Sequence, residues 1–122
     1  MLKMIYVRSV VKVEVVEFRE KCLWAAGFFD GEGTTSVLKA QRDRYAYLRM
    51  SVSQKDPTLL YKFQDIFKCG KVYHNKRGVS SWDCYKKEEV LFVLDSLWPF
   101  ISEQKKAQAQ KAIQYVKEHS KS

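Results

Sequence analysis

Hydrophobic and polar positions change between two periods along the chain, and these changes predict its elements. Residues 19–30 place small and apolar side chains three and four positions apart, which predicts a helix. Residues 34–40 and 45–55 alternate between polar and apolar positions, so we expect two strands joined by a short charged turn. Residues 71–77 and 79–85 predict a second hairpin, around a cationic turn that contains a glycine.

The remaining helices are marked by the residues at their ends. Asp56 and Pro57 commonly begin a helix, and this helix is expected to end before Gly70. Residues 87–97 predict the next helix, and Ser102 is expected to cap a last one that is polar and basic. The resulting order is αββαββα with one more helix. It predicts an α+β fold in which a four-stranded antiparallel sheet is backed by helices.

Residues 4–18 precede this pattern and are rich in β-branched residues. The local prediction is a strand. The sequence also leaves open a helix imposed by its context and a loosely held leader. We therefore divide the chain into residues 1–18, an N-terminal extension of unknown role, and residues 19–122, one folded domain.

Composition narrows the class of protein. Lys and Arg number 22 against 14 Asp and Glu, and the net charge of +8 favours a polyanionic partner, nucleic acid before an anionic membrane. The three cysteines show no CxxC spacing and are expected to be buried, reduced thiols of an intracellular protein. No apolar run reaches about 18 residues, so no membrane span is expected. Residues 1–21 contain glutamates and no cleavage site, so we expect no signal peptide.

One stretch in the first predicted helix carries the most specific chemistry. Ala26 and Gly27 are small enough to let another backbone approach closely. They share one helical face with Leu23 and Asp30. Two carboxylates, Asp30 and Glu32, oppose the helix dipole at its C-terminal end, so they need a partner such as a divalent cation. We expect Asp30 to be structural and Glu32 to be presented from the tip.

Residues 25–33, AAGFFDGEG, resemble the LAGLIDADG motif of homing endonucleases, although Ala25 stands where the motif has leucine. In that family two such helices pack side by side, and each delivers its second acid to a metal at the DNA cleavage site. The resemblance implies that Glu32 is catalytic and that Glu32 and Gly31 bind Mg²⁺. Because the chain has only one motif, it also implies a homodimer whose seam contains Leu23, Ala26, Gly27 and Asp30.

Two further active-site positions follow from the same resemblance. Gln54, near the end of the second strand, takes the place of a polar residue beside the active site. The family also has a lysine at the start of the last helix. Here the spacing is one residue off, and Gln104 falls where that lysine is usual. Lys105 fits if the loop holds one extra residue, and Lys106 is the second choice.

The resemblance further implies that the polar faces of the two hairpins lie in the major grooves that flank the cleavage site. Their aromatic, hydroxyl and basic side chains suit base edges and phosphates. The residues expected to contact DNA are Ser36, Leu38, Arg42, Arg44, Tyr45, Tyr47, Arg49, Ser51, Ser53, Tyr73, Asn75, Lys76, Arg77, Ser81 and Asp83. His74 and Asn75 do not indicate a His-Asn-His nuclease, because no second histidine lies at a useful spacing.

The resemblance implies a function in intron homing. This is metal-dependent hydrolysis of double-stranded DNA by a homodimer, at a long pseudo-palindromic site, leaving 3′ overhangs. RNA-splicing maturases share the scaffold, and RNA would then be the partner. The sequence is also compatible with a catalytically inactive DNA-binding module or a basic structural protein. Intact Glu32 and Gln54 favour the nuclease, whereas the displaced lysine disfavours it.

Overall fold

The computed structural model describes residues 2–40 and 45–119. Its strands and its last three helices lie where the sequence predicts them, although β3 and β4 are shorter than expected. The elements in chain order are α1 (Leu2–Glu32), β1 (Gly33–Ala40), β2 (Tyr45–Gln54), α2 (Thr58–Phe67), β3 (Lys71–His74), β4 (Ser80–Cys84), α3 (Lys87–Leu97), the 3₁₀ turn η1 (Trp98–Phe100) and α4 (Glu103–Glu118).

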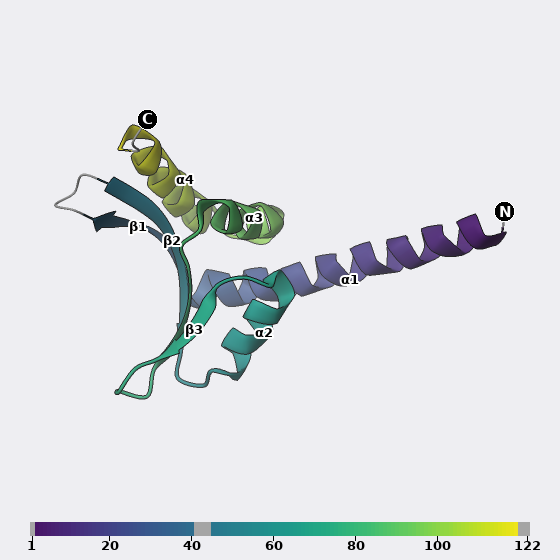
Figure 1. The fold of residues 1–122 in the computed structure, drawn as a ribbon, viewed down its shortest axis with the longest axis horizontal. Coiled ribbons are helices and arrows are strands. Elements are labelled where there is room, and N and C mark those ends of the chain that lie inside the picture. The colour runs from purple at the N-terminus through teal and green to yellow at the C-terminus, as the bar shows by residue number, and fades with distance from the viewer. Residues whose placement is uncertain (1, 41–44, 120–122) are drawn as a thin grey trace.

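The four strands form one antiparallel sheet in the order β1-β2-β4-β3. Gly33 of β1 lies opposite Val52 of β2, and Ser51 of β2 lies opposite Asp83 of β4. Figure 1 shows the described helices on one side of the sheet, whose ends bend toward the other, uncovered side. We call this uncovered side the open face. The architecture confirms the α+β fold that the sequence predicts.

The side chains between the sheet and the helices are apolar, and many are aromatic. Trp82 of β4 and Phe63 of α2 are fully buried, with their ring centroids 4.8 Å apart. The Trp82 indole Nε1 donates a hydrogen bond of 2.9 Å to the carbonyl of Cys69, so its one polar group is satisfied. Gly70 has a φ of 78°, and a Cβ there would overlap the same indole. Both facts require glycine where the sequence places the end of α2.

The first helix is much longer than predicted. Residues 4–18 belong to α1, and the prediction of a strand is wrong. β-Branched residues cost a helix no more than about 0.7 kcal/mol each, and an existing helix gains a hydrogen bond for each residue added. Figure 1 shows this part of α1 projecting from the domain. Of the helices that the structure describes, none combines the length and apolarity needed to cross a membrane.

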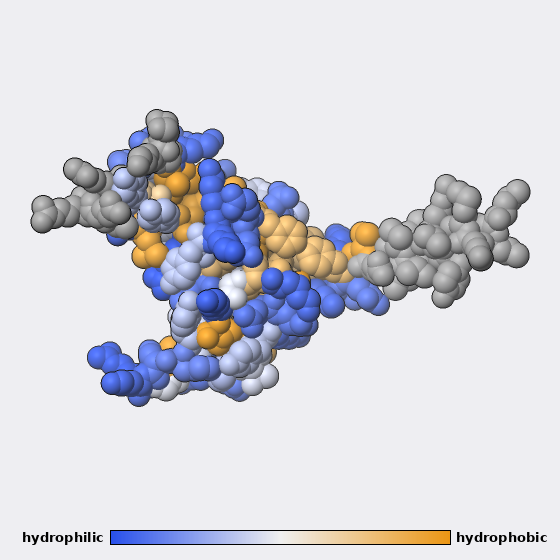
Figure 2. Space-filling model, viewed as in Figure 1, coloured by the Kyte–Doolittle hydropathy of each residue, from blue (hydrophilic) through white to orange (hydrophobic). Residues whose placement is uncertain are grey.

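The base of the projecting helix packs on α2 and α3. The ring centroid of Phe18 lies 6.4 Å from that of Phe67 and 6.5 Å from that of Phe92. Phe18 and Phe92 are still 38% and 49% exposed, and Figure 2 shows a hydrophobic area over α3 and the neighbouring part of α1. Val15 and Val16 are exposed as well. Among the described side chains, Phe18 therefore marks the point where α1 joins the packed domain.

The start of α2 differs from the prediction by one residue. The helix begins at Thr58 rather than at Pro57. The carboxylate of Asp56 accepts a hydrogen bond of 2.9 Å from the Thr58 backbone N–H and one of 2.7 Å from its hydroxyl. These bonds lower the pKa of Asp56. The N-cap position is therefore Pro57 rather than Asp56, although the Asp56 carboxylate still binds the first residue of the helix.

Candidate functional site

The C-terminal end of α1 is joined to the N-terminal end of α4. The Asp30 carboxylate accepts hydrogen bonds of 2.9 and 3.1 Å from the backbone N–H of Ser102, the residue that caps α4. The Ser102 hydroxyl in turn accepts one of 3.3 Å from the backbone N–H of Lys105. An anion is favourable at a helix N-terminus, so Asp30 stabilises the start of α4. This is a structural role, and it occupies the Asp30 carboxylate within its own chain.

Glu32 is the last residue of α1 and is exposed, and β1 begins at the next residue without a connecting loop. Gly33 is buried at this junction, where a Cβ would overlap the ring of Phe29. Phe29 itself is fully buried in the core. The position of Glu32 is therefore fixed by both the helix and the sheet.

Lys105 lies beside this junction. Its Nζ donates a hydrogen bond to the carbonyl of Gly33 and lies 5.9 Å from the centroid of the Phe29 ring. Lys106 points elsewhere: its Nζ lies 5.8 Å from the centroid of the Trp98 ring and 3.4 Å from a carboxylate oxygen of Glu103. Of the two lysines that the sequence offers, Lys105 is the one that α4 brings to Gly33, the residue that follows Glu32.

The neighbouring residues of α4 complete this arrangement. Gln104 is exposed on the first turn of the helix. Gln108 is one turn after Lys105, and its side-chain oxygen accepts a hydrogen bond of 3.0 Å from the backbone N–H of Thr35 in β1. This bond ties α4 to the strand that follows Glu32, so it fixes the position of Lys105 relative to the acid.

Gln54 is the last residue of β2, the strand that pairs with β1. Because Gly33 pairs with Val52 in an antiparallel register, β2 continues two residues past the start of β1, toward the end of α1. Gln54 is half-buried and lies opposite Ser80 of β4. Glu32 and Lys105 thus come together at the junction of α1 and β1, and Gln54 ends the strand that pairs with β1 there.

The open face carries a buried polar network at its centre. Asp83 is only 6% exposed, and its carboxylate accepts a hydrogen bond of 2.5 Å from Ser51 and one of 3.2 Å from Ser81. Arg49 donates to the same carboxylate from Nη2 at 3.4 Å. Ser51 and Asp83 were both expected to contact DNA. Their polar atoms are instead engaged with each other, so their direct contribution to a ligand is limited.

Other predicted contact residues are more exposed to solvent than Ser51 and Asp83. Tyr47 and Tyr73 are 50% and 45% exposed, and Leu38 lies on the same face. Among the other strand residues of this set, Ser53 is exposed, and four are half-buried: Ser36, Tyr45, Arg49 and Ser81. Arg42 and Arg44 lie outside the described residues. Thr34 and Lys71 also lie on the open face and were missed, although the alternation of β1 and β3 extends to both.

The turn between β3 and β4 is shaped by Asn75. Its side-chain oxygen accepts hydrogen bonds of 2.8 Å from the Arg77 backbone and 3.0 Å from the Val79 backbone. Gly78 completes the turn with a φ of 78°. Asn75 was expected to contact DNA, but its side-chain oxygen holds the turn, while Lys76 and Arg77 are exposed on it.

One face of α1 is open next to the site. A Cβ added at Gly27 or Gly31 would meet no atom within 4 Å, and Leu23 is 46% exposed. We call these three residues the glycine face. Ala26, which was predicted to share it, is 1% exposed because it packs into the core of its own chain. The prediction for Ala26 is therefore corrected.

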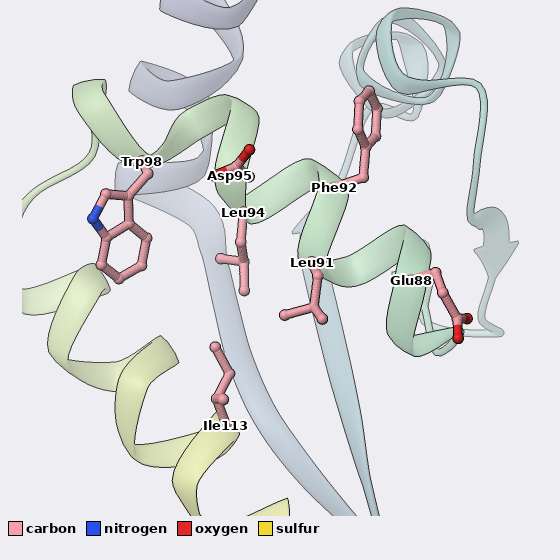
Figure 3. A pocket seen from close by; sticks show the side chains of 7 residues that line it. All are labelled: Glu88, Leu91, Phe92, Leu94, Asp95, Trp98 and Ile113. Carbon is pink, nitrogen blue, oxygen red and sulfur yellow. The ribbon is translucent and has the colours of Figure 1, made fainter. Parts of the chain in front are cut away.

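The helical side of the molecule contains a separate hollow of about 510 Å³ between α3 and α4 (Figure 3). Its lining is mainly apolar, with two acids: Glu88, Leu91, Phe92, Leu94, Asp95, Trp98 and Ile113. Acids and apolar side chains do not favour a polyanion. The open face and the end of α1 are therefore the better candidate for a nucleic-acid site.

The described residues of one chain do not form a complete metal site by themselves. Among residues 2–40 and 45–119, no three His, Cys, Asp or Glu side chains lie close enough together to hold a metal ion. Exposed Glu32 nevertheless supplies a hard oxygen ligand of the kind that Mg²⁺ prefers, and Mg²⁺ often takes only one or two protein carboxylates with phosphate oxygens and water. The residues present fit such an ion if other oxygens come from a ligand or a second chain.

Solved structures place this fold in the class of homing endonuclease domains. The homing endonuclease I-CvuI, in complex with the I-CreI target in the presence of Mg with the DNA not cleaved, is similar with a TM-score of 0.73 and 25% identity, over 84% of this chain and 69% of that one. The homing endonuclease I-TnaI gives a TM-score of 0.66 and 21% identity, over 76% and 69%. I-GzeII, a LAGLIDADG homing endonuclease in complex with its DNA target, gives 0.61 and 31%, over 81% and 38%.

The family model of the LAGLIDADG endonuclease matches residues 25–117. This chain therefore belongs to the LAGLIDADG endonuclease family. The match begins inside α1 and ends in α4, and residues 1–24 lie outside it. A search of curated proteins gives no significant match.

Proposed function

We propose that this protein is a site-specific DNA endonuclease that works as a homodimer with a divalent metal ion. The observation that carries the proposal is the junction of α1 and β1, where exposed Glu32 is followed by Gly33, whose carbonyl accepts a hydrogen bond from Lys105. A carboxylate that can bind a metal ion and a nearby ammonium group that can stabilise negative charge suit phosphodiester hydrolysis. We assign the nuclease to residues 19–122 and leave residues 1–18 without a function.

The open face supports DNA as the ligand. Its exposed tyrosines, hydroxyls and cations suit phosphates and base edges, and the chain carries a net charge of +8. A β-ribbon fits the major groove of B-DNA, so the β1–β2 and β3–β4 hairpins of each chain would enter the major groove on that chain's side of the cleavage site. The DNA complexes of I-CvuI and I-GzeII support this choice of ligand by similarity.

Within the site, each residue has a distinct task. Glu32 and the backbone carbonyl of Gly31 would hold the metal, whose chemistry is to polarise the scissile phosphate and lower the pKa of bound water. Lys105, anchored on the Gly33 carbonyl, would place a positive charge where negative charge develops on the phosphate. Gln54 would orient solvent from the end of β2.

The glycine face supports the homodimer. Glycines at positions 27 and 31 leave room for a second backbone, and two-fold pairing there would bring two copies of Glu32 to one axis. A two-fold protein would read a pseudo-palindromic site. Cleavage of both strands across the minor groove would leave 3′ overhangs. Ala26 is buried and is not part of this proposed seam. Asp30 lies next to the seam, and its carboxylate is bound to the Ser102 N–H of its own chain.

The test is a cleavage selection on a large randomised duplex library, with Mg²⁺ and with EDTA. Wild type is compared with Glu32→Gln, and Glu118→Gln is the matched control, because Glu118 is exposed at the far end of α4. We expect wild type and the control to release cut, pseudo-palindromic sites only with Mg²⁺. Cleavage by Glu32→Gln at the wild-type rate would show that the site is wrongly assigned, and bound but uncut DNA in every metal would indicate a binding module.

A further inference from the structure

The guanidinium of Arg49 lies at the centre of the open face and is held there by a buried acid. Its Nη2 is 3.4 Å from Oδ1 of Asp83, a side chain only 6% exposed, whereas the Arg49 side chain is 34% exposed. Two hydroxyls, from Ser51 and Ser81, donate to the same carboxylate and fix its orientation. The arginine is therefore anchored at one nitrogen while part of its surface faces outward.

The guanidinium has donors left over. Arginine carries five N–H donors in a planar fork, and the carboxylate engages it through Nη2. The Arg49 Nε is buried and has no hydrogen-bond partner in the part of the chain that the structure describes, so the donors within reach of a ligand belong to Nη1 and Nη2. Ser36 of β1 lies directly opposite Arg49, and its side chain is small, so it does not cover the guanidinium. A planar ligand with two adjacent acceptors would therefore meet an oriented guanidinium that still has N–H donors to offer.

In the major groove, one base edge has this arrangement. Guanine presents O6 and N7 as two acceptors, and a bidentate arginine is its commonest specific partner. Adenine and cytosine present a donor there, and thymine offers one acceptor beside a methyl group. An arginine that is already oriented loses less side-chain entropy on binding than a mobile one. The network thus favours guanine over the other bases.

We propose that Arg49 is a specificity-determining residue that reads a guanine in each half-site, and that Asp83 is its positioning residue rather than a DNA contact. The proposal rests on the proposed function, because it requires DNA on the open face. A two-fold protein would show the guanine at two symmetric positions of the target, at equal distances from its centre.

The experiment is a binding selection on a randomised duplex library, carried out in the Glu32→Gln background so that sequence preference is read independently of cutting. The parent should enrich one symmetric pair of guanines that Arg49→Gln no longer enriches, with the preference at that pair falling about 5- to 150-fold. Arg49→Lys should lose most of the preference too, because an ammonium lacks the planar fork. Asp83→Asn should weaken it at the same pair and leave other positions unchanged.

Arg77→Ala is the matched control, because Arg77 is exposed on the β3–β4 turn. It should weaken binding uniformly without changing the base profile. Thermal unfolding confirms that each variant is folded, and the two Arg49 variants carry the test if Asp83→Asn does not fold. An unchanged profile in the Arg49 variants, or a uniform loss like that of Arg77→Ala, would overturn the inference alone. A parent that selects no DNA site would overturn the proposed function and the inference together.

Discussion

The carboxylate of Asp30 binds the backbone N–H of Ser102, so the acid at the end of α1 caps the helix that supplies Lys105. The two charged residues of the candidate site, Glu32 and Lys105, each oppose the dipole of their own helix. Glu32 lies at the C-terminal end of α1, and Lys105 lies in the first turn of α4. Because the two helix ends meet, Glu32 is also near the partially positive start of α4, and Lys105 is near the partially negative end of α1. Asp30 therefore stabilises the arrangement on which the site depends.

Replacing Asp30 by alanine should destabilise the fold. The change removes the acceptor for the Ser102 N–H and a favourable anion at the start of α4, so we expect the free energy of unfolding to fall by about 1–2 kcal/mol. Urea denaturation measures it. Asp30→Asn keeps an acceptor and should recover most of the loss. Equal midpoints for wild type and Asp30→Ala would show that the cap contributes nothing.

Replacing Lys105 by methionine should separate chemistry from binding. Methionine keeps the length of the side chain and removes the charge beside Glu32. We expect the single-turnover cleavage rate to fall by about 10²–10³-fold with DNA affinity nearly unchanged. Lys106→Met is the control, because Lys106 lies over Trp98 and should cut normally. The opposite result, a defect in Lys106→Met alone, would move the active-site lysine by one position.

Replacing Gly27 by leucine should separate folding from dimerisation. The added side chain has open space within one chain and a better helix propensity, so monomer stability should rise by about 0.5–1 kcal/mol. Overlap in a two-fold seam should cost at least about 1.4 kcal/mol, which raises the dimer dissociation constant tenfold. Sedimentation velocity measures the change. Lys21→Leu, exposed on another side of α1, is the control, and a dimer that survives Gly27→Leu would place the seam elsewhere.

Alkaline pH should destabilise the protein through Cys84. Burial, helped by nearby Cys69 and Glu89, raises the pKa of its thiol from 9.0 to about 12. The folded state keeps this proton between pH 9 and 12 while the unfolded state releases it. Stability from the neutral thiol is therefore complete below pH 9 and is lost as the pH rises, by at most about 1.4 kcal/mol per pH unit.

Urea denaturation at pH 7, 9 and 10.5 tests this, with Cys84→Ala as the comparison because the variant has no thiol at this position. The wild type should lose more stability than the variant between pH 9 and 10.5. Parallel losses in the two proteins would show that other groups, such as lysines and tyrosines, account for the alkaline effect.

The sequence predicts the sheet and three helices well, because strict alternation and end-capping residues are local signals. The strand prediction for residues 4–18 is wrong for a non-local reason: these residues continue a helix that is anchored by Phe18 and the motif. Local β-propensity is weak enough to be overridden by that continuity.

The site could be predicted only in part. Glu32 and Lys105 follow from the resemblance, and the fold brings them to one junction. Ala26 was misplaced because two helical faces fit the small residues, and the stripe of Cys22, Ala26 and Phe29 is the one that is buried. Asp83 lies on the predicted face, but no local pattern shows that Arg49, a residue of another strand, engages it.

The direct passage of α1 into β1 has a consequence for target geometry. With no loop between Glu32 and Gly33, the sheet continues directly from the end of α1. In a two-fold pair, the separation of the two sheets follows from how closely the α1 helices approach at Gly27 and Gly31. The number of base pairs between the half-sites is then a property of helix packing. A variant that accepts a longer spacer would require a wider helix seam rather than a longer loop.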